Sequence, residues 1–154
     1  MKALIVYDSV HGNTRIVAQN IGDAIPGEVN VLHASQVNAS ELRTFDLLIV
    51  GAPTHGGRPT EAIQDFLEKV QARALKGTNV AAFDTRLTAK WVRIFGYAAP
   101  RIAASLKEKG GTLVGSPGDF FVKGTKGPLI EGEVERAAAW AKGIVESMTS
   151  PTTA

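Results

Sequence analysis

Cysteine is absent from the 154 residues of this chain. Its absence excludes disulfide bridges, thiolate metal sites, thiol nucleophiles and redox-active Cys-x-x-Cys motifs. Any oxidation or reduction that the protein carries out therefore requires a bound cofactor. The apolar content of 44% is enough to build a core of ordinary size without covalent cross-links.

Long hydrophobic runs are also missing. The apolar stretch Ala3–Val6 is soon followed by Asp8, so it is too short for the core of a signal peptide or for a membrane span. Seventeen basic and fifteen acidic residues give a formal net charge of +2, which is too small to indicate nucleic-acid binding. We expect a cytoplasmic protein that contacts neither membranes nor nucleic acids.

No part of the sequence has the composition of a linker. The 16 glycines and 7 prolines are spread along the chain, and no internal repeat is visible. The length fits one domain of ordinary size. We therefore expect a single domain over residues 1–148, followed by a short tail over residues 149–154.

Short apolar runs that end at turn signals predict buried strands. They are Lys2–Tyr7, Val29–His33, Leu47–Gly51, Asn79–Phe83 and Thr112–Val114. Helical periodicity follows the first, third and fourth runs and returns from Val134 to Met148, and a short or irregular helix is expected between Ala34 and Phe45. This alternation predicts a doubly wound α/β fold with a parallel sheet and helices on both faces. Ligands of such sheets bind beyond the carboxyl ends of the strands, so the loops after the first, third and fourth strands are candidates.

The loop after the first strand runs from Asp8 to Thr14 and leads directly into a helix. Hydroxyl and amide side chains meet the free backbone N–H groups at the positive end of that helix, which predicts an anion site. The same residue types are also ordinary helix caps, so this loop alone supports both interpretations. Neither the G-x-G-x-x-G motif nor the Gly-Lys-Ser/Thr motif of phosphate-binding loops is present.

The loop after the third strand, from Gly51 to Thr60, is longer than a plain strand-to-helix turn requires. Its adjacent glycines, Gly56 and Gly57, permit positive φ angles and a close approach of the backbone to a ligand. We therefore interpret this loop as functional. Thr60 is expected to cap the helix that follows.

With these two loops and its order of strands, the sequence resembles the flavodoxin family over nearly its whole length. The resemblance implies a flavodoxin-like, five-stranded sheet in the order 2-1-3-4-5, with FMN bound at the first and third strands. It also implies that one loop surrounds the FMN phosphate, where relatives carry Ser/Thr-x-Thr-Gly-Asn-Thr. The matching residues here are Ser9, Val10, His11, Gly12, Asn13 and Thr14. Val10 and His11 stand where hydroxyl residues are common, so Val10 offers only its N–H while His11 adds a ring nitrogen.

The same resemblance assigns the third loop to one side of the flavin ring. The matching residues are Pro53, Thr54, His55, Gly56 and Gly57. The peptide at Gly56 is implied to rotate when the flavin is reduced, so that its carbonyl accepts the new proton on N5. His55 stands where relatives often have an aromatic residue or Met, and an imidazole there can stack on the ring or donate to it. The alternative for His55 is an ordinary solvated loop histidine.

The fourth loop is implied to cover the outer face of the flavin. Asp84, Thr85 and Arg86 begin this segment, and Trp91 matches the position of the stacking tyrosine found in relatives. Tyr97 is the second candidate for stacking. Trp91 can alternatively belong to the core at the edge of the sheet.

Basic residues gather in the same segment, and no acidic residue lies between Asp84 and Glu108. The cations are Arg86, Lys90, Arg93, Arg101 and Lys107. They form either a solvated face or a docking site for an acidic redox partner or for the phosphates of NAD(P)H. Electron-carrying flavodoxins are typically acidic, which disfavours the anionic reduced flavin. A cation such as Arg58, Arg86 or Lys90 would attract the reduced flavin and make it easier to form here than in those relatives.

The function predicted from these observations is electron transfer through non-covalently bound FMN, with a redox partner protein or NAD(P)H as the electron source. One alternative is a small FMN-dependent NAD(P)H oxidoreductase, and another is a flavodoxin-fold protein that has lost FMN and acts as an interaction domain. A response-regulator receiver is disfavoured, because the third strand ends at Gly51-Ala52-Pro53 without a phosphoacceptor Asp. The oligomeric state is left open.

Overall fold

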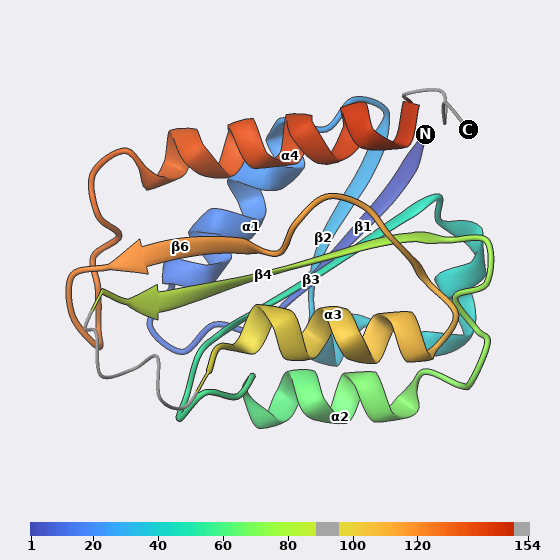
Figure 1. Ribbon diagram of the computed structural model, residues 1–154, viewed down its shortest axis with the longest axis horizontal. Coiled ribbons are helices and arrows are strands. Elements are labelled where there is room, and N and C mark those ends of the chain that lie inside the picture. The colour runs from blue at the N-terminus through green and yellow to red at the C-terminus, as the bar shows by residue number, and fades with distance from the viewer. Residues whose placement is uncertain (89–95, 150–154) are drawn as a thin grey trace.

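The computed structural model describes residues 1–88 and 96–149 (Figure 1). Its central parallel strands are β1 (Lys2–Tyr7), β2 (Glu28–His33), β3 (Leu47–Pro53), β4 (Asn79–Leu87) and β5 (Thr112–Leu113). They are hydrogen-bonded in the order β2-β1-β3-β4-β5, and every pair along this path is parallel. The predicted fold class and strand order are therefore confirmed.

The far edge of the sheet differs in detail from the single strand predicted over Thr112–Val114. There the chain forms two short strands in succession, β5 and β6 (Gly118–Val122), and both pair with β4. The interruption has a local cause, since Gly115 has a φ of +67° and Pro117 has no N–H to donate to a ladder. Because β6 pairs with Phe83–Leu87, it supports an extension of β4 beyond the predicted end at Phe83.

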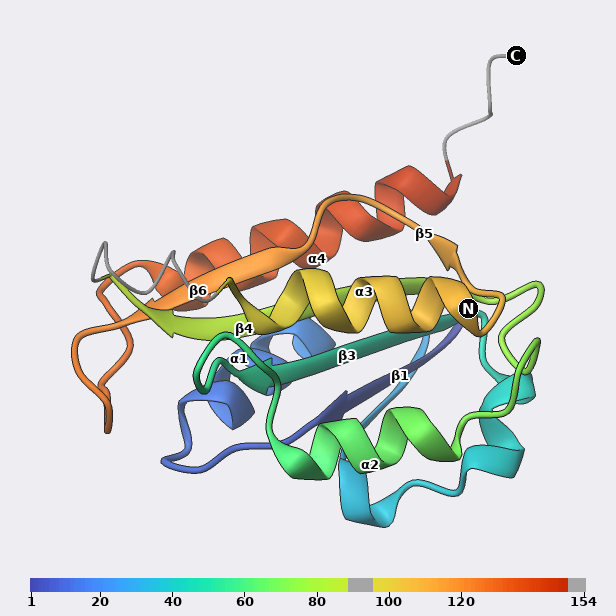
Figure 2. The ribbon, with the colours of Figure 1, turned by 60° about the horizontal axis from the view of Figure 1, so that its bottom comes forward.

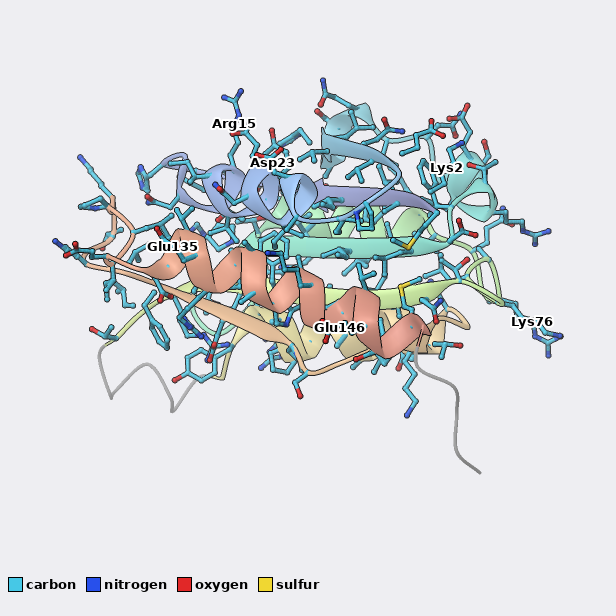
Figure 3. All side chains as sticks on the ribbon, turned by 90° about the horizontal axis from the view of Figure 1, so that it is seen from above. Lys2, Arg15, Asp23, Lys76, Glu135 and Glu146 are labelled. Atoms are coloured by element: carbon cyan, nitrogen blue, oxygen red, sulfur yellow. The ribbon has the colours of Figure 1, made fainter. Side chains whose placement is uncertain are left out.

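Helices cover both faces of the sheet (Figures 1 and 2). One face carries α1 (Asn13–Asp23) and α4 (Glu133–Thr149), and the other carries α2 (Glu61–Lys69) and α3 (Ala98–Glu108). Seen from the α4 side, α1 and α4 lie next to each other while Arg15 and Glu135 point outward into solvent (Figure 3).

The alternation of side chains along each strand divides the core into two halves. In β1, Leu4 and Val6 pack towards α2 and α3, whereas Ala3 and Ile5 pack towards α1 and α4. All four residues are at most 1% exposed, as expected for a parallel sheet that is covered on both faces. This burial explains why the strands appear in the sequence as continuous apolar runs.

The connections are as regular as the sequence suggests, with one exception. Between β2 and β3 the chain forms two short 3₁₀ helices, η1 (Ala34–Gln36) and η2 (Ala39–Thr44), where a short or irregular helix was predicted. Thr60 does precede α2, but its hydroxyl makes no capping hydrogen bond, so that part of the prediction is wrong. Within the described residues, no helix has the length and apolar composition needed to cross a bilayer.

Candidate functional site

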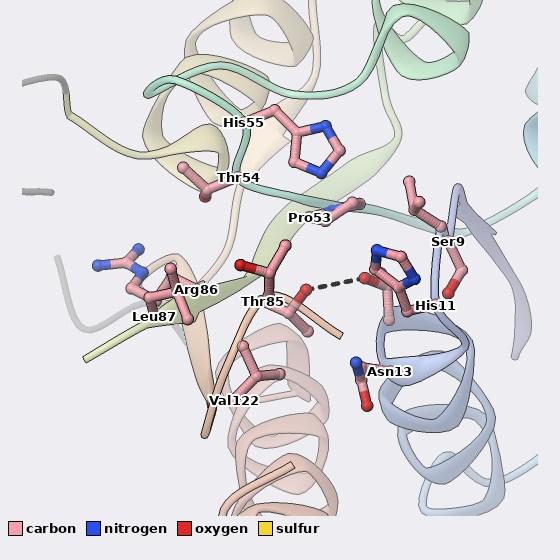
Figure 4. Close-up of a pocket in the computed structure, with 13 residues that line it drawn as sticks. Ser9, His11, Asn13, Pro53, Thr54, His55, Thr85, Arg86, Leu87 and Val122 are labelled. Atoms are coloured by element: carbon pink, nitrogen blue, oxygen red, sulfur yellow. Dashed lines mark hydrogen bonds between the residues drawn. The ribbon is translucent and has the colours of Figure 1, made fainter. Parts of the chain in front are cut away.

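A cavity opens at the carboxyl ends of β1, β3 and β4, where the loops after these strands converge (Figure 4). Its lining combines residues that are distant in the sequence. They are Ser9, Val10, His11, Asn13, Thr14, Pro53, Thr54, His55, Thr85, Arg86, Leu87, Val122 and Thr125. The first and third loops, which the sequence analysis assigned to one site, therefore do meet in space.

The first loop presents unused hydrogen-bond donors. Ser9 Oγ accepts the N–H groups of Gly12 at 3.1 Å and of Arg15 at 3.3 Å, which fixes the curve of the loop. Gly12 has a φ of +92°, which a residue with a side chain rarely adopts. Several backbone N–H groups around this curve have no acceptor within residues 1–88 and 96–149, namely those of Val10, His11, Asn13 and Thr14. An oxyanion would satisfy donors arranged in this way.

The floor of the cavity is closed by a pair of threonines. Thr14 Oγ1 and Thr85 Oγ1 are 2.8 Å apart, and the two residues are 1% and 4% exposed. This hydrogen bond, drawn as a dashed line in Figure 4, joins the first turn of α1 to the extended part of β4. It holds the helix start at a fixed distance from the sheet.

The third loop contains a tight turn at its tip. The N–H of His55 donates to the carbonyl of Arg58 at 2.8 Å, and the reverse bond measures 3.0 Å. Between them Gly56 and Gly57 have φ angles of +56° and +80°, the signs of a type I′ turn. Thr54 anchors the base of the turn, since its N–H donates to the Thr85 carbonyl and its hydroxyl accepts the N–H of Ala98.

The comparisons with known proteins agree with this geometry. A family model described as a flavodoxin domain matches residues 4–115. This chain belongs to the flavodoxin family. A flavodoxin from Maridesulfovibrio salexigens is 26% identical over 159 aligned residues, which cover 96% of this chain and 99% of the relative.

Solved flavodoxin structures superpose closely on this one. Oxidised flavodoxin 2 from Bacillus cereus has a TM-score of 0.79 at 29% identity, over 95% of this chain and 99% of that one. A flavodoxin from the domain Archaea shares the fold with a TM-score of 0.80 at 24% identity, over 97% and 100% of the two chains. Flavodoxins bind FMN and transfer electrons to and from redox partner proteins, and membership of the family gives this chain that cofactor and that function.

The donor set of the cavity fits FMN at its phosphate end. A phosphate monoester is a compact anion, and the first loop offers it the free N–H groups already described and the hydroxyl proton of Ser9, whose oxygen is occupied as an acceptor. A Cβ added at Gly12 would meet nothing within 4 Å, so the backbone angle and not lack of space requires glycine there. Val10, which lacks the hydroxyl common in relatives, still contributes its free N–H.

Asp84 lies behind the cavity wall and not on its surface. Its carboxylate is fully buried and accepts hydrogen bonds from Arg86 Nε at 2.8 Å, Arg86 Nη2 at 2.7 Å and the N–H of Ala99 at 2.9 Å. Burial raises the pKa of Asp84, although the contact with Arg86 opposes the shift. Along β4, Asp84 and Arg86 face α3 while Thr85 faces α1, as strand alternation requires.

The candidates for stacking on the flavin are placed as follows. Trp91 lies outside the described residues. The ring of Tyr97 lies beneath the guanidinium of Arg86, whose Cζ is 3.5 Å from the ring centroid, so one face of Tyr97 is already covered. Tyr97 does not line the cavity, and neither do Gly56 and Gly57, which shape the turn beside it.

Three residues of the lining were missed by the sequence analysis, namely Leu87, Val122 and Thr125. Leu87 was missed because β4 was predicted to end at Phe83, and Val122 because no strand was predicted over Gly118–Val122. The strand ends in the short apolar run Phe120–Val122, and this run was a usable signal. Thr125 follows this strand and carries no comparable signal.

The cations near the site differ in how far they are neutralised. Burial disfavours the charge of Arg86, but the contacts with Asp84 and Asp119 together raise its pKa, so the guanidinium stays charged and is neutralised by neighbouring carboxylates. Arg58 is exposed at the end of the tight turn and forms no ion pair with any described residue. Arg58 and Arg101 line a groove between α2 and α3, and Lys90 lies outside the described residues.

Proposed function

We propose that this flavodoxin holds the phosphate of FMN on the loop of residues 9–14 and its ring beside the turn formed by His55–Arg58. The observation that carries the proposal is the set of free N–H groups on the first loop, which open into the same cavity as Thr54 and His55. Bound FMN supplies the reversible electron chemistry, which the protein's own side chains lack. Pro53, Thr54 and Thr85 would line the space between the two ends.

The polypeptide contributes position and hydrogen bonds. The residues of the turn, Gly56 and Gly57, tolerate more than one backbone conformation, so the Gly56 peptide can present its carbonyl to a proton on flavin N5 after reduction. His55, which directly precedes Gly56, would cover one edge of the flavin ring. Trp91 and Tyr97 remain the candidates for the outer face, and Tyr97 would have to use the face that Arg86 does not cover.

We also propose that the redox partner presents an acidic surface. A groove that borders the tight turn is lined by three cations, Arg58, Arg101 and Lys109, and by two acids, Glu68 and Glu108. Neither arginine forms an ion pair with a described residue. Cations placed beside the exposed edge of a cofactor attract carboxylates and speed the encounter. A cytoplasmic location, expected from the sequence, belongs to the same proposal and is tested by cell fractionation.

The test for the cofactor is titration of the apoprotein with FMN, in which the quenching of flavin fluorescence reports binding. Saturable quenching with one FMN per chain and a yellow purified protein are expected. A colourless protein that leaves FMN fluorescence unchanged would overturn the proposal and support a flavodoxin fold without a flavin.

The test for the partner uses small oxidants of opposite charge. Reduced protein is mixed with ferricyanide or with tris(phenanthroline)cobalt(III), and the reoxidation rate is followed as salt is added. An anion-attracting site predicts that the ferricyanide rate falls with ionic strength while the cobalt rate rises. The opposite slopes would exclude an acidic partner at this edge. Bleaching of the flavin by NADPH or NADH alone would instead support the reductase.

A further inference from the structure

Asp8 and His33 form a polar junction directly below the first loop. Asp8 follows the last residue of β1 and His33 ends the neighbouring strand β2. The distance from His33 Nε2 to Asp8 Oδ1 is 2.8 Å, and the side chains are only 33% and 14% exposed. The N–H of Ser9 donates to the same oxygen, Asp8 Oδ1, at 2.9 Å. One carboxylate oxygen therefore connects β2 to the first residue of the phosphate loop.

The histidine is itself held in one orientation. Its Nδ1 accepts the N–H of Ser35 at 3.1 Å and lies 2.8 Å from Ser35 Oγ. With Nδ1 acting as an acceptor, the proton of the neutral ring is on Nε2, which donates it to Asp8. The edge of the ring also meets Tyr7, with centroids 5.7 Å apart and planes at 87°. His33 thus presents a fixed donor to Asp8.

The connection continues from Asp8 into the loop. Ser9, whose N–H is held by Asp8, uses its hydroxyl oxygen to accept the N–H groups of Gly12 and Arg15. The hydrogen bonds therefore run from His33 through Asp8 and Ser9 to the residues that begin α1. Along this path lie the free N–H groups of Val10, His11, Asn13 and Thr14, whose directions depend on the curve of the loop.

We propose that Asp8 and His33 are positioning residues that hold the loop of residues 9–14 in its phosphate-binding conformation. The inference rests on the proposed function, since it assigns the phosphate to this loop. A carboxylate close to a phosphate site repels the ligand, so charge does not explain why Asp8 lies there. The inference gives this carboxylate a geometric role instead. What the loop needs from residue 8 is an oxygen at the place of Oδ1, which accepts two N–H groups.

The experiment compares FMN with riboflavin, which has the same ring but no phosphate. Asp8→Ala removes the shared oxygen and should weaken FMN binding roughly five- to tenfold, the effect of one or two lost hydrogen bonds, while riboflavin binding changes less than about twofold. Asp8→Asn keeps an oxygen at this position and should bind FMN at least as tightly as the wild type. Dissociation constants come from fluorescence quenching of each apoprotein.

A matched control lies at the other end of the same strand. Asp46 Oδ2 accepts the N–H of Lys2 at 2.7 Å, so Asp46→Ala removes a comparable carboxylate contact from β1 far from the loop. This variant should lose stability in thermal unfolding yet bind both flavins like the wild type. It separates a local effect on the loop from a general loss of stability.

Each outcome distinguishes the inference from the function on which it rests. Equal weakening of FMN and riboflavin in Asp8→Ala, no weakening of FMN, or an Asp8→Asn variant as weak as Asp8→Ala would each overturn the positioning role. A wild-type protein that binds riboflavin but gains nothing from the phosphate would overturn the placement of FMN itself. Thermal unfolding of both variants verifies that they are folded.

Discussion

The hydroxyl oxygens of Thr14 and Thr85 lie 2.8 Å apart although the two residues are 71 positions apart in the sequence. Thr14 belongs to the first turn of α1 and Thr85 to the part of β4 that pairs with β6. Their contact makes the geometry of the loop of residues 9–14 dependent on the far edge of the sheet. It couples the stability of the fold to the shape of the cavity.

Replacement of one partner in this pair should be costly. In Thr85→Val the shape is kept but the buried Thr14 hydroxyl loses its partner, so the free energy of unfolding should fall by about 1–3 kcal/mol. Urea denaturation of the apoprotein measures this change. The double variant Thr14→Val/Thr85→Val should cost less than the sum of the two single variants, because it leaves no unpaired hydroxyl. Strict additivity would show that the two hydroxyls do not interact.

The tight turn at His55–Arg58 should be sensitive to backbone angle and not to volume. Gly56 has a φ of +56°, and an added Cβ would meet nothing within 4 Å. Gly56→Ala should therefore lower the free energy of unfolding by about 1 kcal/mol, whereas Gly56→Asn should cost less because Asn tolerates this region. Thermal or urea unfolding of the apoproteins compares them. Equal costs for Ala and Asn would point to a cause other than the φ angle.

Asp8 should contribute an acid-dependent part of the stability. Burial opposes its ionisation, but the nearby Thr60 hydroxyl, His33 and the N–H of Ser9 together lower the pKa of Asp8 below its ordinary value of 3.8. Thr60 Oγ1 forms no hydrogen bond with any described residue, so we attribute the effect chiefly to His33 and Ser9.

The sign of the dependence follows from this shift. A carboxylate with a lowered pKa in the folded state stabilises the fold above its unfolded pKa and loses that contribution as the pH falls through its folded pKa. Asp8→Asn should therefore be less stable than the wild type near neutral pH and approach it below about pH 4. Urea unfolding between pH 3 and pH 7 measures the difference. A difference that is constant over this range would contradict the assignment.

Arg58 should influence the reduction potential of the bound flavin more than Arg86 does. Arg86 is paired with Asp84, whereas Arg58 has no ion-pair partner among the described residues. Arg58→Glu places a negative charge beside the proposed site of the flavin ring and should lower the midpoint potential of the flavin by on the order of 20–50 mV at low salt. Anaerobic spectroelectrochemistry of the FMN complex measures the shift, which should shrink as salt is added.

The control for that variant is Lys76→Glu, which makes the same change of charge in an exposed loop. Lys76 lies at the opposite end of the sheet from Arg15, which follows the phosphate loop (Figure 3). The midpoint potential of the Lys76→Glu variant should match that of the wild type within a few millivolts, since screening removes charge effects over such distances. Equal shifts in both variants would indicate an effect of net charge and not of position.

Much of this architecture was predictable because it depends on local sequence. Strands β1 and β3 are buried on both faces, so they are continuous apolar runs, and the helices between them carry a periodic apolar face. Alternation of the two then leaves few topologies with right-handed crossovers. The loops at residues 9–14 and 51–60 could be assigned to one site for the same reason, because carboxyl ends of parallel strands share an edge.

The rest depended on contacts between distant residues, which no local pattern encodes. Asp84 follows the fourth apolar run and looked available to a ligand, but pairing with Arg86 and Ala99 turns it away from the cavity. The end of β4 and the existence of β6 depend on each other, since residues 83–87 of β4 pair with residues 118–122 of β6. Local residue patterns are enough to establish the order of the elements and the edge of the sheet at which a ligand binds. Which polar groups pair with one another depends on the folded chain, because a hydrogen bond is satisfied by whichever partner folding brings within reach.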